Sequence, residues 1–198
     1  HTRFRNVTGV QTCALPISGP GNGIHIYPKA LREIFGLKFK QVAGYTTSAE
    51  IFLAIERGEV DGVCVSFDSV LERYADWLKS GKIRVLLQGG AARNALLPDT
   101  PFVMDFARNE DERQTLKFLY AGLAIGRPIA GPPGMAADRV KILRDAFVAT
   151  MKDADFLAEA EKARLRLEAT DGAALAALVE DLARTPQGVR DRVAKILR

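Results

Sequence analysis

The sequence lacks the features that mark membrane-spanning, metal-binding and nucleic-acid-binding chains. No apolar run approaches the roughly 20 residues that a transmembrane helix needs, and no stretch combines a basic start with an apolar middle as a signal peptide does. No block of five like charges occurs, so the net charge of +4 does not indicate nucleic-acid binding. Histidine is limited to His1 and His25, and the cysteines, Cys13 and Cys64, have no CxxC spacing, so we expect no metal site.

What the sequence does contain is the composition of an ordinary folded chain: 198 residues, of which 47% are apolar and 26% charged. This length allows one complete core, or one domain and part of another. From Gly19 onward, short apolar stretches typical of strands alternate with stretches of helical periodicity, and short turns separate them. The alternation predicts an α/β fold with parallel strands.

The beginning of the chain reads as a segment of different origin. Residues 7–17, VTGVQTCALPI, resemble a codon-by-codon translation of a common sequencing-adapter read. We therefore expect residues 1–18 to be an artefactual leader that replaces the native start and its signal peptide. Without Arg3 and Arg5 the chain has 26 basic and 24 acidic residues, a net charge of +2. The apolar run CALPI can still pair as a substitute strand, although Pro16 favours an edge or irregular position.

The first half of the remaining chain is expected to alternate helices and strands. Gly36 and Gly58 each follow a helical pattern, as C-terminal caps do. Thr47 and Glu50 fit a capping box, in which the threonine hydroxyl accepts a bond from a backbone N–H and the glutamate reaches back to the cap. The expected helices are 24–35, 47–58 and one that carries Val70 and Leu78 and ends at Gly81; the expected strands are 39–44, 60–67 and 83–87.

The second half is expected to be mostly helical. Two prolines make residues 91–101 a loop, and the following residues predict a polar helix at about 105–117 and a strand at 118–125. The segment GRPIAGPPG, residues 126–134, is the strongest linker signal, and Pro133 is expected close to the start of a long helix. That helix carries one apolar stripe, formed by Val140, Leu143, Phe147 and Met151. Asp171 and Thr185–Pro186 are expected to begin the last two helices.

Two turns place backbone N–H groups at the start of a helix: SGPGNGIH at residues 18–25 and GYTTS at residues 44–48. The first N–H groups of a helix have no internal partner and carry partial positive charge, so both turns can bind an anion without Arg or Lys. A glycine-rich turn is equally compatible with a purely structural role, and the GxxxxGK[ST] pattern of nucleotide-binding loops is absent. His25 is placed either to donate to a ligand or to lie at the surface.

Several motifs, taken in order, carry a family resemblance. The chain contains SGPGN-x-x-H, GY-T-T-S, RGEVDG, KIRVLLQ, R-x-x-x-LPDTP and RP-x-x-x-PPG…DRV…LR-x-AF. In this order, over nearly all of residues 19–198, they resemble the substrate-binding proteins of tripartite tricarboxylate transporters, also called Bug receptors. The resemblance implies a periplasmic receptor with a type II periplasmic-binding-protein (Venus flytrap) fold. Such a receptor closes on a small organic carboxylate and docks on membrane carrier subunits; it is not an enzyme and holds no cofactor.

The resemblance also implies a domain division and a set of contact residues. Residues 19–126 match the ligand-binding lobe with an incomplete first strand, and residues 127–198 match the C-terminal helical segment of the other lobe. Two departures concern the ligand class: Thr46–Thr47 stands where the family often has Lys–Gly, and the tail after Leu165 is longer. The matched contact positions are Ser18, Gly19, Gly21, Asn22, Gly23, His25, Tyr45, Thr46 and Thr47, with Ser66 and Phe67 as further candidates.

Two other functions remain compatible with the sequence. A ligand-sensing receptor of the same fold would carry the same motifs, and neighbouring genes for carrier subunits or for a sensor kinase distinguish the two. A small α/β hydrolase or transferase would use the glycine turn as a phosphate cradle and Cys64 or Ser66 as nucleophile. Such an enzyme needs a general base, and His25 is the only histidine outside the expected leader. The G-x-S-x-G pattern of a nucleophile elbow is also absent. Cys64 also fits a small buried core residue.

Overall fold

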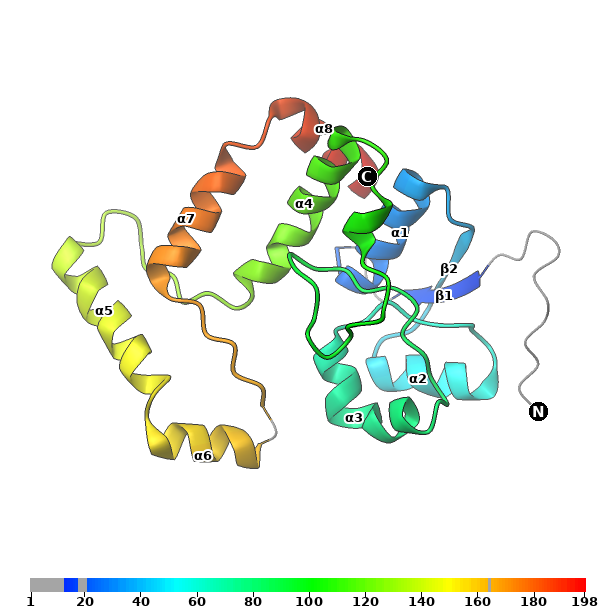
Figure 1. The fold of residues 1–198 in the computed structure, drawn as a ribbon, viewed down its shortest axis with the longest axis horizontal. Coiled ribbons are helices and arrows are strands. Elements are labelled where there is room, and N and C mark those ends of the chain that lie inside the picture. Colours follow the sequence, from blue (N-terminus) through cyan, green and yellow to red (C-terminus); the bar gives the residue numbers. More distant parts are fainter. Residues whose placement is uncertain (1–12, 18–20, 164) are drawn as a thin grey trace. The chain divides into compact units, whose positions relative to one another are not determined.

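The structure, a computed structural model, describes residues 13–17, 21–163 and 165–198 (Figure 1). It is a mixed α/β chain, mostly helical, with one small parallel sheet, so the expected class is confirmed at this level. Contacts divide it into two compact units: His1–Arg73 with Asp191–Arg198, and Tyr74–Arg190. Two helices, α3 (Phe67–Lys79) and α8 (Gln187–Leu197), each contribute to both units.

The sheet of the first unit consists of β1 (Cys13–Ile17) and β2 (Phe39–Ala43). The two strands are parallel, with Cys13 opposite Phe39 and Ile17 opposite Ala43. The sequence predicted the second strand at 39–44, and β1 is the CALPI run at the end of the expected leader, which the sequence allowed to pair as a substitute strand. That run is therefore part of the first unit, and helix α1 (Gly23–Phe35) packs against both strands.

Pro16 lies inside β1 without interrupting the ladder. The Ala14 N–H donates to Asp61 Oδ2 at 2.7 Å and the Ala14 carbonyl accepts from the Asp61 N–H at 3.0 Å. Because N–H groups two residues apart along a strand point to the same edge, Pro16 directs its missing donor toward the Asp61 edge and not toward β2. The expected edge preference of Pro16 is satisfied in this way.

The helices of the first unit begin and end where the sequence predicts. Gly36 and Gly58, with φ of 69° and 73°, end α1 and α2 (Ser48–Arg57) in the left-handed conformation that glycine adopts without strain. The contacts also assign the C-terminal segment, Asp191–Arg198, to this unit. The buried apolar side chains of the unit include Leu15, Leu31, Ile51, Phe52, Val60, Val70, Val193 and Ile196.

The strands expected at 60–67 and 83–87 are wrong. Residues 61–66 have no strand assignment and Phe67 already begins α3, which has a non-helical residue, Tyr74, at its middle. After α3 only an isolated bridge between Gln88 and Phe102 forms. The Val-rich and Leu-rich runs predict strands that extend a sheet. Among the described residues, however, the sheet consists of β1 and β2 alone.

The strand expected at 118–125 is also wrong, because these residues form the second half of α4 (Glu110–Ile125). Leu116, Leu119 and Tyr120 are buried at the i, i+3, i+4 spacing of one helix face. Leu123, one turn further along the same face, is 48% exposed, so the burial ends before the helix does. A short apolar run such as FLYAGLAI does not by itself distinguish a strand from a buried helix segment. The polar residues before it start a helix, and the apolar run continues that helix.

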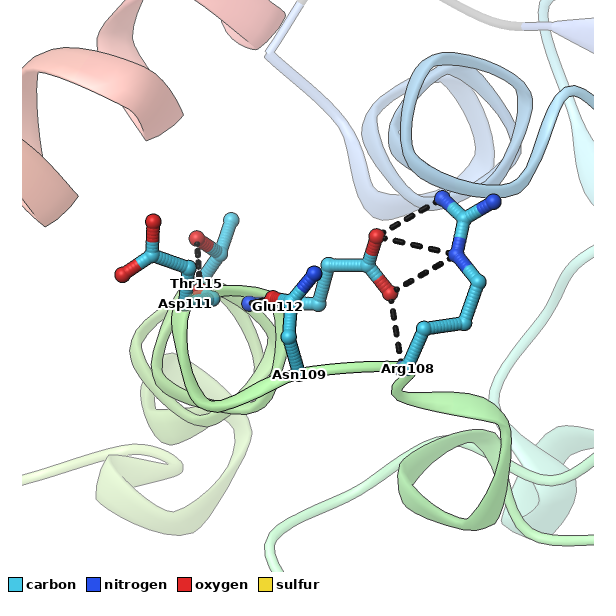
Figure 2. Close-up of polar contacts among 5 residues, drawn as sticks. All are labelled: Arg108, Asn109, Asp111, Glu112 and Thr115. Atoms are coloured by element: carbon cyan, nitrogen blue, oxygen red, sulfur yellow. Dashed lines mark hydrogen bonds and ion pairs between the residues drawn. The ribbon is translucent and has the colours of Figure 1, made fainter.

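Figure 2 shows how α4 starts. Asn109 Oδ1 accepts a hydrogen bond from the Glu112 N–H at 2.9 Å, and the Glu112 carboxylate accepts from the Arg108 N–H at 2.9 Å and from the Arg108 guanidinium at 2.7 Å. The Thr115 hydroxyl donates to the Asp111 carbonyl at 2.7 Å. The side chains of the first turn thus take up the backbone groups that a helix end leaves unpaired. A 3-10 turn, η1 (Val103–Phe106), precedes this start.

The C-terminal helices differ in part from the expectation. The long helix starts at Ala137, four residues after Pro133, and ends at Thr150 as α5; an unexpected helix, α6 (Ala154–Lys162), follows it. Asp171 caps α7 (Gly172–Ala183) as predicted, accepting bonds from the N–H groups of Ala173 and Ala174. Residue 126, where the two lobes were expected to divide, lies inside the second unit, so that division remains a prediction.

Candidate functional site

The candidate site begins with the register of the sheet. Ile17 lies opposite Ala43 at the carboxyl ends of two parallel strands, so the turns that follow both strands leave the same edge. Each turn leads into a helix: the first into α1 at Gly23 and the second into α2 at Ser48. The parallel register therefore directs both connections, toward the helix starts at Gly23 and Ser48, from one edge of the sheet, as the anion-binding hypothesis requires.

The first turn is built around Asn22. Its side chain accepts a hydrogen bond from the Ile24 N–H at 3.2 Å and its carbonyl accepts from the N–H groups of His25 and Ile26, both at 2.9 Å. Gly21 has a φ of 92°, which favours glycine. The predicted contact residues Ser18 and Gly19 lie outside the described residues.

Gly23 is needed at this helix start for a steric reason that sequence reasoning missed. A Cβ at position 23 would lie 2.9 Å from Cε2 of Tyr27, one helical turn further on. Tyr27 is half-buried, and burial, with the nearby Cys64 thiol as a smaller cause, raises the pKa of its hydroxyl. The spacing Gly23-x-x-x-Tyr27 was the sequence signal from which this contact could have been predicted. The tyrosine ring forms an apolar wall beside the turn.

His25 contributes a buried polar atom. Its Nδ1 is buried and is the single buried side-chain nitrogen or oxygen atom without a hydrogen-bond partner among the described residues. The His25 carbonyl accepts a hydrogen bond from Gln41 Nε2 of β2 at 2.8 Å, which holds this turn of α1 against the sheet. A buried nitrogen without a partner is costly in a folded protein. The atom gains a partner if a ligand oxygen binds there.

The second turn is already partly filled by a side chain. Thr47 Oγ1 accepts from the Glu50 N–H at 3.3 Å, which confirms the threonine half of the predicted capping box. The Glu50 carboxylate accepts from the Thr46 N–H at 2.8 Å and from the Thr46 hydroxyl at 2.9 Å, one residue beyond the expected cap. Two donors of Thr46, expected to hold a ligand, are thus taken up by Glu50. Tyr45 beside them is half-buried.

What remains for a ligand is a small set of backbone donors. No described residue accepts a hydrogen bond from the N–H groups of Gly23, Ser48 or Ala49, and all three stand in the first turn of a helix. An anion at α2 meets the negative charge of Glu50, whereas α1 has no acidic residue in its first turn. The two helix starts therefore differ in electrostatic character.

Glu50 makes the stability of the first unit depend on pH. Hydrogen bonds from the Thr46 backbone and hydroxyl lower the pKa of Glu50 below its ordinary value of 4.5, so folding favours the ionised form. Its stabilising contribution is present above the ordinary glutamate pKa and is lost as the pH falls through the lowered value. In thermal melts, the melting temperature of Glu50→Gln should lie below that of the unmodified chain at neutral pH. The difference should shrink on acidification.

The matched control for this experiment is Glu72→Gln. Glu72 is exposed on α3, and its replacement removes the same charge without removing the Thr46 bonds. If both variants show the same loss of melting temperature at every pH, the Glu50 contacts contribute nothing specific.

The third candidate pair, Ser66 and Phe67, lies at the other side of β1. The bonds between Asp61 and Ala14 place the segment after Asp61 along the edge of β1 opposite to β2. A Cβ at Gly62 would lie 3.7 Å from Leu15 Cδ2, so the start of this segment lies beside β1. Ser66 is exposed and Phe67 is half-buried.

Cys64 is a poor nucleophile in this setting. Burial raises the pKa of its thiol to about 11, so almost none of it is thiolate at neutral pH. No group of three or more His, Cys, Asp or Glu side chains suited to a metal ion occurs within the described ranges. In the same ranges no helix is long and apolar enough to span a membrane. No family model matches the sequence, and a search of curated proteins finds no match.

Proposed function

We propose that this chain is part of an extracytoplasmic solute-binding receptor that captures a small organic carboxylate for a tripartite uptake transporter. The receptor would have the type II periplasmic-binding-protein fold and pass its ligand to membrane carrier subunits. The observation that carries the proposal is the parallel register of β1 and β2, which sets two helix starts at one edge of the sheet. Ligands of open parallel sheets bind outside the carboxyl ends of the strands.

The chemistry of this edge suits a carboxylate. The donors are backbone N–H groups at helix starts, which favour negative charge without a positively charged side chain. Hydrogen bonds to a charged group contribute roughly 1.5–3 kcal/mol each, so three of them offset a large part of the cost of desolvating a carboxylate. His25 Nδ1 would add one polar contact, and Tyr27 an apolar surface.

The carboxyl ends of β1 and β2 favour a position for the ligand, because ligands of open parallel sheets bind beyond these ends. The helices that follow the two strands are α1 and α2. We place one carboxylate of the ligand at Gly23 and His25, and the remainder of the ligand toward Ser48 and Ala49.

Backbone amide resonances provide the direct test. Titration of the ¹⁵N-labelled chain with succinate is expected to shift the amide signals of Gly23, Ser48 and Ala49, whereas succinamide, which is neutral, is expected to leave them unchanged. Because Glu50 places a negative charge at the second helix start, we expect weak binding, with a Kd on the order of millimolar. Shifts confined to other residues, or equal shifts with succinamide, would contradict the proposal.

Ser48→Pro removes one donor with little effect on the fold. Proline is tolerated at the first position of a helix, and Thr47 before it has φ −131° and ψ 155°, the extended conformation that a residue before proline prefers. We expect the variant to keep the native spectrum and to bind succinate less tightly. Unchanged affinity would remove Ser48 from the site.

A further inference from the structure

The end of α3 and the residues that follow it carry positive charge without negative charge. Residues 77–98 contain no aspartate or glutamate and four basic residues: Lys79, Lys82, Arg84 and Arg93. The first three of these are exposed, and Arg93 is paired with the Asp105 carboxylate. A local excess of one charge sign attracts a surface of the opposite sign.

Residues 82–87 direct their side chains alternately to two sides. Positions 82, 84 and 86 are exposed, and positions 83, 85 and 87 are half-buried. This period of two is that of an extended chain, in which alternate side chains point to the same side. The outward side therefore carries Lys82, Arg84 and Leu86. Leu86 is 75% exposed, so an apolar side chain stands in water beside two cations.

Trp77, close to the end of α3, lies beside this outward side. Lys82 Nζ lies 3.8 Å from the centre of the Trp77 ring, a cation–π contact. The Ile83 N–H donates to the Trp77 carbonyl at 3.2 Å, and at the other end of the segment the Gln88 N–H donates to the Pro101 carbonyl at 2.9 Å. The segment is thus fixed at both ends, and its outward side is held next to the indole ring.

This combination of side chains is typical of a peripheral membrane contact. Anionic head groups attract basic side chains, indole rings prefer the boundary between lipid and water, and an exposed leucine can enter the apolar layer below. A soluble anion would use the charges and leave Leu86 in water. An apolar protein surface would cover Leu86 and leave the two cations without a counter-charge. An anionic lipid surface satisfies both.

We propose that the patch formed by Trp77, Lys82, Arg84 and Leu86 binds the surface of a membrane that contains anionic lipids. Leu86 enters below the head groups, and the two cations lie at the lipid phosphates. The inference does not depend on which ligand the proposed receptor binds. Each basic residue near an anionic surface strengthens binding about fivefold, so two of them with one leucine give half-maximal binding at roughly millimolar lipid.

A vesicle titration that follows tryptophan fluorescence tests the proposal. Trp77 is the single tryptophan of the chain, so the signal comes from the patch itself. Vesicles of phosphatidylcholine and phosphatidylglycerol in equal parts, up to about 10 mM lipid, should shift the emission to shorter wavelength and sediment the chain. Vesicles of phosphatidylcholine alone should do neither. Added salt should weaken the binding, because it screens the attraction between the cations and the lipid.

Two substitutions separate the contributions of charge and insertion. Arg84→Glu should weaken binding at least about tenfold, because it replaces an attraction by a repulsion. Leu86→Asn, a polar residue of similar size, should weaken binding about fivefold or more, because the inserted apolar surface is lost. The matched controls are Lys152→Glu just beyond α5 (Ala137–Thr150) and Ile142→Asn on α5, where Ile142 is 64% exposed. Both controls should bind as the unmodified chain does.

The substituted side chains are exposed, so circular dichroism should show an unchanged fold in all four variants. Absence of binding to the anionic vesicles over the whole range overturns the proposal. Equal losses in the variants and the controls overturn it as well, because only net charge and general apolarity would then matter. Normal binding by Leu86→Asn overturns the insertion and leaves the patch to soluble anions, which a titration with glycerol phosphate detects.

Discussion

Leu116→Ala is expected to destabilise the second unit by about 2–5 kcal/mol. Leu116 is completely buried in α4, together with Val103 of η1 and Thr115. Leucine and alanine have similar helix propensities, so the loss comes from removed apolar contacts and from the cavity left behind. Urea unfolding monitored by circular dichroism measures the change as a shift of the midpoint.

The control for Leu116 lies on the same helix. Leu123 is 48% exposed two turns later, and Leu123→Ala should change the free energy of unfolding by no more than about 0.5 kcal/mol. The pair tests how far burial extends along α4, because Leu123 lies two turns after Leu116 on the same side of the helix and is nevertheless exposed. Equal losses for the two variants would contradict the described burial along α4.

Val193→Asp is expected to destabilise the first unit by roughly 3–5 kcal/mol, since it places an unpaired charge in a core position. Val193 is 5% exposed on α8, and the contacts group its segment, Asp191–Arg198, with the first unit. If the end of the chain completes this core, the loss should appear far away in sequence. Hydrogen exchange at the β2 amides of Gln41 and Val42 should accelerate in the variant.

Val179→Asp is the matched control for this experiment. Val179 is 49% exposed on α7, in the second unit, so the same substitution should leave the free energy of unfolding almost unchanged and leave exchange in β2 as it was. Normal exchange of the β2 amides in Val193→Asp would show that the C-terminal helix is not part of the first core.

Local chemistry in the sequence predicts those parts of the fold that depend on neighbouring residues. Gly36, Gly58 and Asp171 mark helix ends and a helix start because a left-handed cap or a side-chain cap needs only the adjacent backbone. The strand at Phe39–Ala43 was predicted correctly as well, and CALPI forms the strand that its sequence allowed. The strands expected at 60–67, 83–87 and 118–125 were wrong, because the same apolar runs can be buried in loops or helices when other elements surround them.

The candidate site shows the same division. The sequence predicted two turns rich in N–H donors, and the parallel register brings them to one edge. It predicted a capping role for Glu50, but not that its carboxylate would bond Thr46 and take up donors expected to serve a ligand. The close approach of the Tyr27 ring to Gly23 depends on side-chain placement, and the hydrogen bond between Asp61 and Ala14 of β1 depends on how distant segments pair.

The sequence by itself determined where helices start and stop, which turns present N–H groups, and that the chain has neither the apolar runs of a transmembrane segment nor a metal-binding pattern. These properties follow from residue types and from spacings of a few positions, over which backbone chemistry acts. The tertiary structure decided which apolar runs became strands, that Glu50 fills the second turn, and that Val193 is buried. Each of these outcomes depends on contacts between residues distant in the chain, and no local pattern contains the position of the partner.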